Sequence, residues 1–345
     1  MWKFLLLQKI HDDGLDLLRS RPDITVTCLD GIHQEDEDVT ASIRDAHAVT
    51  IRKAHITEPI LEAAPNLVVV SKHGVGVDNI DLDAATESGI VVVNAPGELT
   101  TTVAEAALTM IFALGRQSMR YDRSLRTGDM VVRESLIASD IAGKSVLIIG
   151  FGRVGREVAR LCGAVGMATM AYDPFLPTAV FASAGCQQVV NLRDGLKVAD
   201  FVCVNCPLTP ETGNMIGAEE VALMRPSAVL VNISRGGVVD ENALYHALVE
   251  HRLKGVGLDV FDGDFPRLDN PLLKLDNVLL SPHSAALTED CARRLAVATV
   301  RNALAILDGN YSPAMVVNKE VLDRHNLRAP APQRNGVAKP EGNLA

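Results

Sequence analysis

Aromatic residues and long apolar runs are scarce in this chain of 345 residues. Phenylalanine, tryptophan and tyrosine together make up 4% of it, which argues against a pocket built for a large aromatic group. No apolar run approaches the roughly 20 residues that a transmembrane helix needs. The first residues, MWKFLLLQKIHDDG, resemble a signal peptide only briefly, because charged residues follow at once. We therefore expect a first β-strand there.

Basic residues are also fewer than acidic residues. The formal net charge is −10 and the isoelectric point is near 5.4. Nucleic acids and anionic membranes attract basic surfaces, so neither is expected as a partner. A small anionic substrate stays possible, because it needs only a local positive pocket. Apolar residues at 48% and charged residues at 22% are ordinary for a globular protein, and the length favours two domains.

Cysteine is sparse, with six residues spread over the chain. Most lie in apolar contexts, which favours reduced thiols and a cytoplasmic protein. Cys203 and Cys206 form a C-x-x-C in ADFVCVNCPLTP, but no second Cys/His pair follows at zinc spacing. We expect neither a metal site nor redox chemistry there.

Short apolar runs alternate with amphipathic stretches along the first hundred residues. This alternation predicts a parallel α/β sheet with crossover helices. The expected helices are 14–21, 40–46 and 58–64, and the expected strands are 4–8, 24–29, 48–52, 66–74 and 89–97.

A second α/β series follows a long apolar helix expected at Thr101–Gln117. That helix is too apolar for a surface position, so we place it between domains or at a subunit contact. A last helix is expected at Glu289–Asp308, and the polar segment 319–345 reads as a flexible tail. The strands expected in the second series are 145–150, 167–173, 200–206, 228–234, 255–261 and 277–283.

A glycine-rich motif opens this second series. Gly150, Gly152 and Gly155 form G-x-G-x-x-G between a strand and a helix, and Asp173 ends the next strand. Such glycines permit a tight turn, close approach of a pyrophosphate and close helix–strand packing, while the acid binds a ribose diol. The acid repels a 2′-phosphate and no arginine follows it, so the predicted cofactor is NAD rather than NADP.

The stretch AVLVNISRGGVVD places Arg235 and two glycines directly after a buried strand. Arginine binds a carboxylate with two parallel hydrogen bonds and stays charged at every relevant pH. A strand ending in LLSPH brings His283 to the same edge of the sheet, and an imidazole titrates near neutrality. We therefore expect both residues to lie near the dinucleotide site, at the carboxyl ends of the strands.

Several of these motifs occur in an order that resembles the D-isomer-specific 2-hydroxyacid dehydrogenases. The resemblance starts at SKHGVGVDNIDLDAAT, continues through TTVAEAAL and the glycine motif, and ends with NISRGGVVD, GLDVFDGDFP and LLSPHSAA. It implies a Rossmann nucleotide domain, residues 99–287, inserted into a flavodoxin-like substrate domain. The substrate domain would comprise 1–98 and 288–318, with hinges near Pro96–Glu98 and Ala285–Thr288.

The resemblance implies three catalytic residues. Arg235 would bind the substrate carboxylate and polarise the keto oxygen, and His283 would be the general acid/base. The family places a glutamate before a proline after DVF, but here Asp264 is followed by Phe265 and then Pro266. The shorter side chain leaves its reach toward His283 open, with Asp262 as the alternative partner.

Further residues are candidates for binding. Asp259 resembles the family position that holds the nicotinamide carboxamide, although an ordinary strand-end acid is the alternative. The cofactor-binding candidates are Gly150, Gly152, Arg153, Val154, Gly155, Asp173, Cys206, Pro207, Ile233, Ser234 and Asp259. The substrate-binding candidates are Arg52, Lys72, His73, Gly74, Val75, Gly76 and Arg235, with backbone N–H groups of the glycine loop available to an anion. Solvated surface cations remain the alternative for Arg52 and Lys72, and His73 could simply line the cleft.

Three functions remain open at this stage. The first is an NAD-dependent dehydrogenase of a small anionic D-2-hydroxy acid or 2-keto acid, most like 3-phosphoglycerate dehydrogenase. The second is a glyoxylate/hydroxypyruvate reductase, and the third is a non-catalytic NAD(H)-sensing protein. The arm RYDRSLRTGDMVVRES, residues 120–135, suggests a homodimer as in the family, although it lacks the tryptophan often found near Met130.

Overall fold

Two parallel sheets organise the chain, in a computed structural model that describes residues 1–29, 36–135, 137–263 and 265–330. Unit 1 comprises the residues up to Leu99 and those from Thr288 onward, and unit 2 comprises Thr100–Leu287. The predicted fold class, with one parallel α/β unit inserted into another, is confirmed by these sheets.

The sheet of unit 1 has five parallel strands in the order β2-β1-β3-β4-β5. The chain leaves β1 for β2 on one side and returns to β3 on the other, so the order reverses between β1 and β3. Their bounds are β1 Trp2–Leu6, β2 Ile24–Cys28, β3 Ala48–Ile51, β4 Val69–Lys72 and β5 Val91–Val93. The central strands β3, β4 and β5 are buried on both faces, as expected for a parallel sheet covered by helices.

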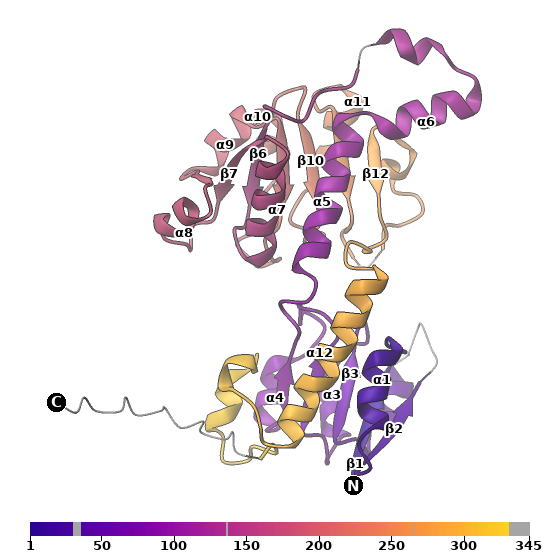
Figure 1. Ribbon diagram of the computed structural model, residues 1–345, viewed down its shortest axis with the longest axis vertical. Coiled ribbons are helices and arrows are strands. Elements are labelled where there is room, and N and C mark those ends of the chain that lie inside the picture. The colour runs from indigo at the N-terminus through magenta and orange to yellow at the C-terminus, as the bar shows by residue number, and fades with distance from the viewer. Residues whose placement is uncertain (30–35, 136, 264, 331–345) are drawn as a thin grey trace, which may run out of the picture. The chain divides into compact units, whose positions relative to one another are not determined.

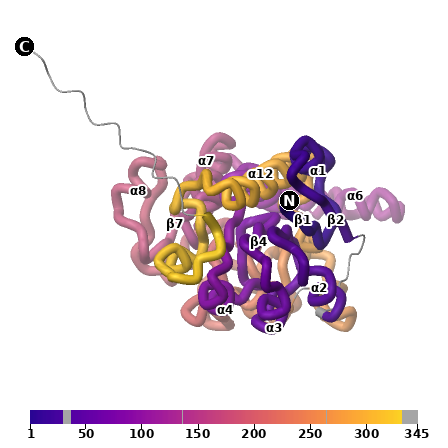
Figure 2. Tube along the Cα trace, turned by 90° about the horizontal axis from the view of Figure 1, so that it is seen from below, coloured from indigo at the N-terminus to yellow at the C-terminus, as the bar shows by residue number. Residues whose placement is uncertain are grey.

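Helices cover both faces of this sheet (Figures 1 and 2). One apolar core lies under α1 (Asp12–Arg19) and α12 (Glu289–Leu307). The other lies under α2 (Asp36–Ile43), α3 (Glu58–Glu62) and α4 (Leu82–Glu87). Helix α4 was not among the expected elements, although Asp81 caps it through the N–H of Ala84.

The segment after α12 differs from the flexible tail expected from residue 319. The short helices η3 (Pro313–Met315) and η4 (Lys319–Asp323) follow, and Val321 is fully buried in the core under α1 and α12. Arg328 donates to the carbonyls of Ala64 and Leu67. Apolar anchors therefore fix 319–330, and the rest of the expected tail, 331–345, lies outside the described residues.

The sheet of unit 2 has seven parallel strands in the order β12-β11-β10-β9-β6-β7-β8. The chain runs outward from β6 to β8 and then returns to β9, so the order reverses between β6 and β9. The two-residue edge strand β8 was not expected. The bounds are β6 Ser145–Ile149, β7 Ala168–Tyr172, β8 Gln187–Gln188, β9 Phe201–Val204, β10 Val229–Asn232, β11 Gly255–Leu258 and β12 Val278–Leu280.

Helix α5 (Thr100–Gly115) packs within unit 2, against α7 (Arg153–Ala164) and strands β10 and β11 (Figure 1). A Cβ added at Gly257 would meet Met110 and Leu114 of α5, so the helix lies directly on the sheet. Its apolar composition is explained by this burial, whereas the sequence led us to place it between domains or at a subunit contact.

The other elements of unit 2 complete its layers. Helices α9, α10 and α11 pack over a large core on one side of the sheet. Most of α6 lies in the arm of residues 120–135. No helix in the described part of the chain is both long and apolar enough to cross a membrane. The bounds are α6 Ser118–Thr127, η1 Val131–Ser135, α8 Thr178–Ser183, α9 Leu192–Val198, α10 Ala218–Leu223, α11 Glu241–Val249 and η2 Pro271–Lys274.

Candidate functional site

The glycine-rich turn lies where the strand order of unit 2 reverses, after the carboxyl end of β6. Gly150 has a φ of 86°, and an added Cβ would lie 2.8 Å from the amide nitrogen of Cys206. At Gly155 an added Cβ would lie 2.1 Å from the carbonyl oxygen of Gly150. Both contacts are with backbone, which cannot move aside easily. The turn therefore requires glycine at these two positions, as the motif predicted.

Gly152 differs from its two neighbours because an added Cβ would meet nothing within 4 Å. It is the N-cap of α7 and provides no side-chain cap for the first N–H groups of that helix, those of Arg153 and Val154 among them. Open space in front of uncapped helical N–H groups suits a pyrophosphate. The residues present thus fit a dinucleotide, whose phosphates would be held at this helix end.

Asp173 follows the carboxyl end of β7 beside the same turn. Its Oδ2 accepts a hydrogen bond from the N–H of Phe151 at 2.9 Å, and its Oδ1 accepts one from Phe175 at 3.1 Å. The carboxylate thus fixes the turn, and it keeps lone pairs for a ribose diol. Cys206 and Pro207 follow β9 on the other side of the reversal point, with Cys206 buried and Pro207 exposed.

Arg235 lies in the loop after β10, half-buried. The side-chain amide of Asn232 donates to the carbonyl of Arg235 at 2.9 Å, and its oxygen accepts from the N–H and hydroxyl of Ser234. Sequence reasoning did not single out Asn232, although it ends the strand that carries the arginine. Gly236 allows a close approach, since its Cβ would lie 1.6 Å from the carbonyl oxygen of Phe261. This packing, and the buried Ile233, hold the loop of Arg235 against the segment after β11.

His283 lies in the loop after β12, exposed on unit 2 and with a left-handed φ of 52°. The loop is held by Asp259, which is 1% exposed. Its two carboxylate oxygens accept from the N–H groups of Ser284 at 2.7 Å and Ala285 at 3.0 Å, while its carbonyl accepts from His283 at 2.8 Å. Asp259 in turn donates its N–H to the carbonyl of Asn232 at 3.0 Å. A chain of hydrogen bonds therefore links the loops of Arg235 and His283.

Asp264, the expected third catalytic residue, lies outside the described residues. Asp262 is described and exposed, and its N–H donates to Glu241 Oε1 at 2.6 Å. Glu241 Oε2 also accepts from the side chain of Asn270 at 2.6 Å. Glu241 thus holds both ends of the loop that contains 264. Its position at the start of α11 gave no signal of this in the sequence.

In unit 1, Lys72 is positioned to support a loop. It is 9% exposed, and its ammonium donates to the carbonyl of Arg52 at 2.7 Å and to the side chain of Asn79. Asn79 donates to the carbonyl of Ala54 at 2.6 Å. These bonds fix the loop after β3, whose Arg52 side chain is exposed and pairs with no carboxylate within the described residues. The interpretation of Lys72 as a surface cation is wrong.

The glycine loop after β4 offers fewer N–H groups than expected. Gly74, with a φ of 146°, donates its N–H to the carbonyl of Lys72 at 3.0 Å. In the described part of the chain, the N–H groups of Val75 and Gly76 donate to no protein acceptor. Asn94 holds the loop through the carbonyl of Val75 at 2.7 Å. Val75 and Gly76 therefore remain the candidates for binding an anion through the backbone.

The thiols of the C-x-x-C are buried in the sheet of unit 2. Burial raises the pKa of Cys203 to about 12 and that of Cys206 to about 11, which disfavours the thiolate that redox chemistry and metal binding require. Cys203 and Cys206 are not joined in a disulfide.

Comparison with known proteins identifies the family. The family described as "D-isomer specific 2-hydroxyacid dehydrogenase, NAD binding domain" matches residues 108–285, which lie within unit 2. The chain belongs to the D-isomer specific 2-hydroxyacid dehydrogenase family. The resemblance drawn from the motifs is thereby confirmed, as is the presence of an NAD-binding domain.

Individual members of the family share both sequence and fold with this chain. The D-3-phosphoglycerate dehydrogenase of Methanocaldococcus jannaschii is 37% identical, over 92% of this chain and 59% of the relative. The glyoxylate reductase of Thermococcus onnurineus is 35% identical, over 95% of this chain and 98% of the relative. The structure of D-lactate dehydrogenase from Aquifex aeolicus, complexed with NAD and lactic acid, has a TM-score of 0.78 at 27% identity, over 89% of this chain and 96% of that chain. The present chain therefore spans little more than half the length of the D-3-phosphoglycerate dehydrogenase.

Proposed function

We propose that the chain is an NAD-dependent oxidoreductase that interconverts a small D-2-hydroxy acid and its 2-keto acid. One observation carries this proposal. Arg235, Asp259 and His283 follow the carboxyl ends of the adjacent strands β10, β11 and β12, in the same sheet as the glycine-rich turn. Ligands of open α/β sheets bind at this edge.

Each residue has a proposed task. The guanidinium of Arg235 binds the substrate carboxylate with paired hydrogen bonds and polarises the keto oxygen. His283 donates a proton to the oxygen of the forming alcohol and accepts it in the reverse direction. When bound, NADH supplies the hydride for the substrate's second carbon. Asp264 is the proposed acid that stabilises the imidazolium, with Asp262 as the alternative.

The remaining binding roles are also proposals. Asp173 and the N-terminal turn of α7 hold the ribose and pyrophosphate of NAD, while Ser234 and Asp259 line the path to its nicotinamide. Arg52, His73 and the backbone of Val75 and Gly76 bind the substrate from unit 1. Lys72 supports that loop from behind, because its ammonium is already bound to Arg52 and Asn79.

Among possible substrates, 3-phosphoglycerate is proposed first, because the relatives include D-3-phosphoglycerate dehydrogenases and because Arg52 adds a cation to Arg235. Glyoxylate and hydroxypyruvate are the alternative, supported by the glyoxylate reductases, one of which matches over almost its full length. A homodimer is proposed from the exposed apolar side chains of the arm. A cytoplasmic location is proposed from the buried free thiols of Cys162, Cys186, Cys203 and Cys206.

A steady-state screen tests the proposal. The full chain is assayed for NADH and NADPH oxidation with phosphohydroxypyruvate, hydroxypyruvate, glyoxylate and pyruvate. We expect turnover with NADH in preference to NADPH, because Asp173 repels a 2′-phosphate. Binding of NADH without turnover on any keto acid would favour the non-catalytic NAD(H)-sensing protein instead.

Arg235→Ala supplies the matched test of the site. Losing one side of a hydrogen-bonded ion pair costs about 2–5 kcal/mol, so kcat/KM should fall by roughly a hundredfold or more. Arg252→Ala is the control, because Arg252 is an exposed arginine of the same unit whose side chain pairs with Glu250. Similar kinetics for Arg235→Ala and the parent chain would remove Arg235 from the mechanism.

A further inference from the structure

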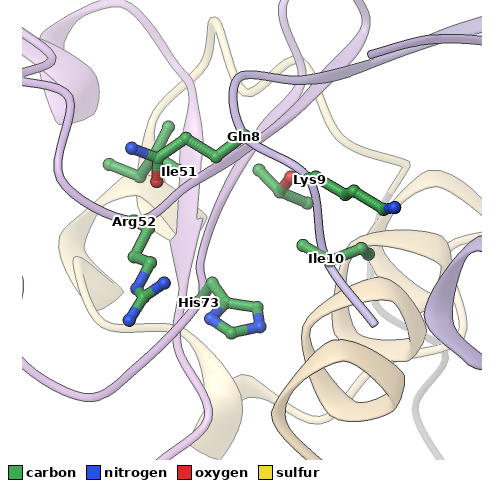
Figure 3. A pocket seen from close by; sticks show the side chains of 7 residues that line it. Gln8, Lys9, Ile10, Ile51, Arg52 and His73 are labelled. Carbon is green, nitrogen blue, oxygen red and sulfur yellow. The ribbon is translucent and has the colours of Figure 1, made fainter. Parts of the chain in front are cut away.

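A small pocket lies wholly within unit 1, at the point where its strand order reverses. It is lined by residues at the carboxyl ends of three strands, Gln8 and Lys9 after β1, Ile51 and Arg52 at the end of β3 and His73 after β4 (Figure 3). Ligands of open α/β sheets bind where the strand order reverses. Unit 1 therefore has a potential ligand site of its own.

Two polar atoms of the pocket residues lack hydrogen-bond partners. His73 Nε2 and Gln8 Oε1 are both buried, and neither is bonded within the described residues. Buried polar atoms are nearly always satisfied in folded proteins, and exceptions often mark functional sites. The pocket thus presents hydrogen-bonding capacity that the protein itself does not use.

The charges around the pocket restrict what it can bind. Burial beside Arg52 and Lys72 lowers the pKa of His73 to about 4, so its imidazole is uncharged at neutral pH. The exposed guanidinium of Arg52 lies next to the imidazole (Figure 3). The hollow itself has room for about one water-sized group. A single oxygen atom, hydrogen-bonded to the imidazole and close to a cation, matches these features.

We propose that this pocket binds one oxygen atom carried by the third carbon of the substrate, through the imidazole of His73 and beside the guanidinium of Arg52. This assignment rests on the proposed function. It makes His73 a determinant of specificity that selects 2-keto acids bearing an oxygen on that carbon. Hydroxypyruvate and phosphohydroxypyruvate both carry such an oxygen, whereas pyruvate lacks it.

Hydroxypyruvate and pyruvate differ by that one oxygen, so their kcat/KM ratio is the direct test. We expect the parent protein to prefer hydroxypyruvate by about a hundredfold or more, since a site built to hydrogen-bond a substrate group rejects the analogue lacking it. His73→Phe should reduce this ratio by at least about tenfold, the loss of one hydrogen bond of ~1.4 kcal/mol. His73→Gln should restore part of it, because its amide can still bond an oxygen.

His325→Gln is the control, an exposed histidine of unit 1 outside the pocket. Melting temperatures of all variants exclude unfolding as the cause. The proposal is overturned if the parent protein reduces both keto acids equally well, or if His73→Phe slows both reactions by the same factor.

A binding experiment separates this proposal from the proposed dehydrogenase activity. Imidazole ¹⁵N spectra of the full chain are recorded with D-glycerate, which carries the oxygen, and with D-lactate, which does not. The His73 signal, identified by its loss in His73→Gln, should move with D-glycerate only. If the chain shows no turnover but the His73 signal still shifts with D-glycerate, only the proposed function is rejected. If the His73 signal does not shift when D-glycerate is added, the pocket assignment is rejected.

Two sources of the oxygen can be distinguished in the same assays. If it belongs to a phosphoryl group, phosphohydroxypyruvate is the better substrate and Arg52→Gln removes that preference. If it belongs to a hydroxyl group, hydroxypyruvate is the better substrate and Arg52→Gln leaves the order of the two unchanged.

Discussion

Gly152 at the start of α7 and Gly163 near its end are both exposed. A Cβ added at either position would meet nothing within 4 Å. They differ in surroundings, because Gly152 stands before the uncapped N–H groups of the helix and Gly163 lies in its last turn. At the scale of single residues, this pair contrasts a glycine proposed to leave room for a ligand with one that has no proposed ligand beside it.

Gly152→Ala should weaken NADH binding by about tenfold or more, because the methyl group occupies the approach of the pyrophosphate. Its melting temperature should stay close to that of the parent, since nothing is displaced. Gly163→Ala should bind NADH normally and gain about 0.5–1 kcal/mol of stability from helix propensity. Titration of NADH fluorescence and thermal melts measure both effects. Unchanged NADH affinity in Gly152→Ala would show that the dinucleotide does not bind at this turn.

His73 also determines how stability depends on pH. Its folded pKa of about 4 lies below the ordinary value of 6.5, so the unfolded chain binds the proton more tightly. The stability it contributes is present above pH 6.5 and is lost as the pH falls toward 4. His73→Gln should therefore flatten the decline of the unfolding free energy between pH 6.5 and 4, measured by urea titration. His325→Gln should leave this decline unchanged. If the unfolding free energy fell equally steeply with pH in both variants, the lowered pKa of His73 would be contradicted.

At the scale of elements, the loop after β12 depends on the end of β11. Asp259 satisfies two N–H groups of that loop and holds His283 in a left-handed conformation. The sequence resemblance implied that Asp259 binds the nicotinamide. Its hydrogen bonds show that it also holds the loop after β12. The end of one strand thus positions the loop that follows the neighbouring strand.

Asp259→Ala should lower kcat by about a hundredfold or more, because the loop of His283 loses its anchor, and should cost about 1–3 kcal/mol for each N–H left unsatisfied. Asp240→Ala is a matched control, since Asp240 also accepts from two backbone N–H groups, at the start of α11. It should cost about 1 kcal/mol of stability with little change in kcat. Steady-state kinetics and urea melts compare the two. Equal losses of kcat would mean that Asp259 acts only through stability.

At the scale of the whole molecule, the arm of unit 2 exposes apolar side chains to solvent. Leu125 is 69% exposed, Met130 57% and Val131 77%. Such residues on one projecting segment are typical of a surface that another chain covers.

Leu125→Glu combined with Val131→Glu should convert the proposed homodimer to monomer, because charges would be buried in an apolar contact. Light scattering coupled to size exclusion measures the mass. Val190→Glu is the control, as Val190 is 85% exposed in unit 2 but outside the arm. A parent chain that already runs as a monomer would refute the dimer.

Local sequence signals predicted every strand except the two-residue β8, together with the glycine-rich turn and the family, because each depends on short-range patterns. Hydrophobic periodicity marks a buried strand, and only glycine fits the turn at Gly150 and Gly155. Asp173, Arg235 and His283 could be named for the same reason, since they directly follow strands.

What only the tertiary structure decided depends on contacts between distant residues. It placed α5 against the sheet, packed 319–330 onto unit 1 and bound Lys72 to the loop of Arg52. It also revealed Asn232, Glu241 and the pocket of His73 and Gln8. A residue's neighbours along the chain predict its backbone, but its hydrogen-bond partners come from loops that the sheet brings together. Burial and pairing, which decide whether a polar group supports the fold or serves a ligand, therefore appear only in three dimensions.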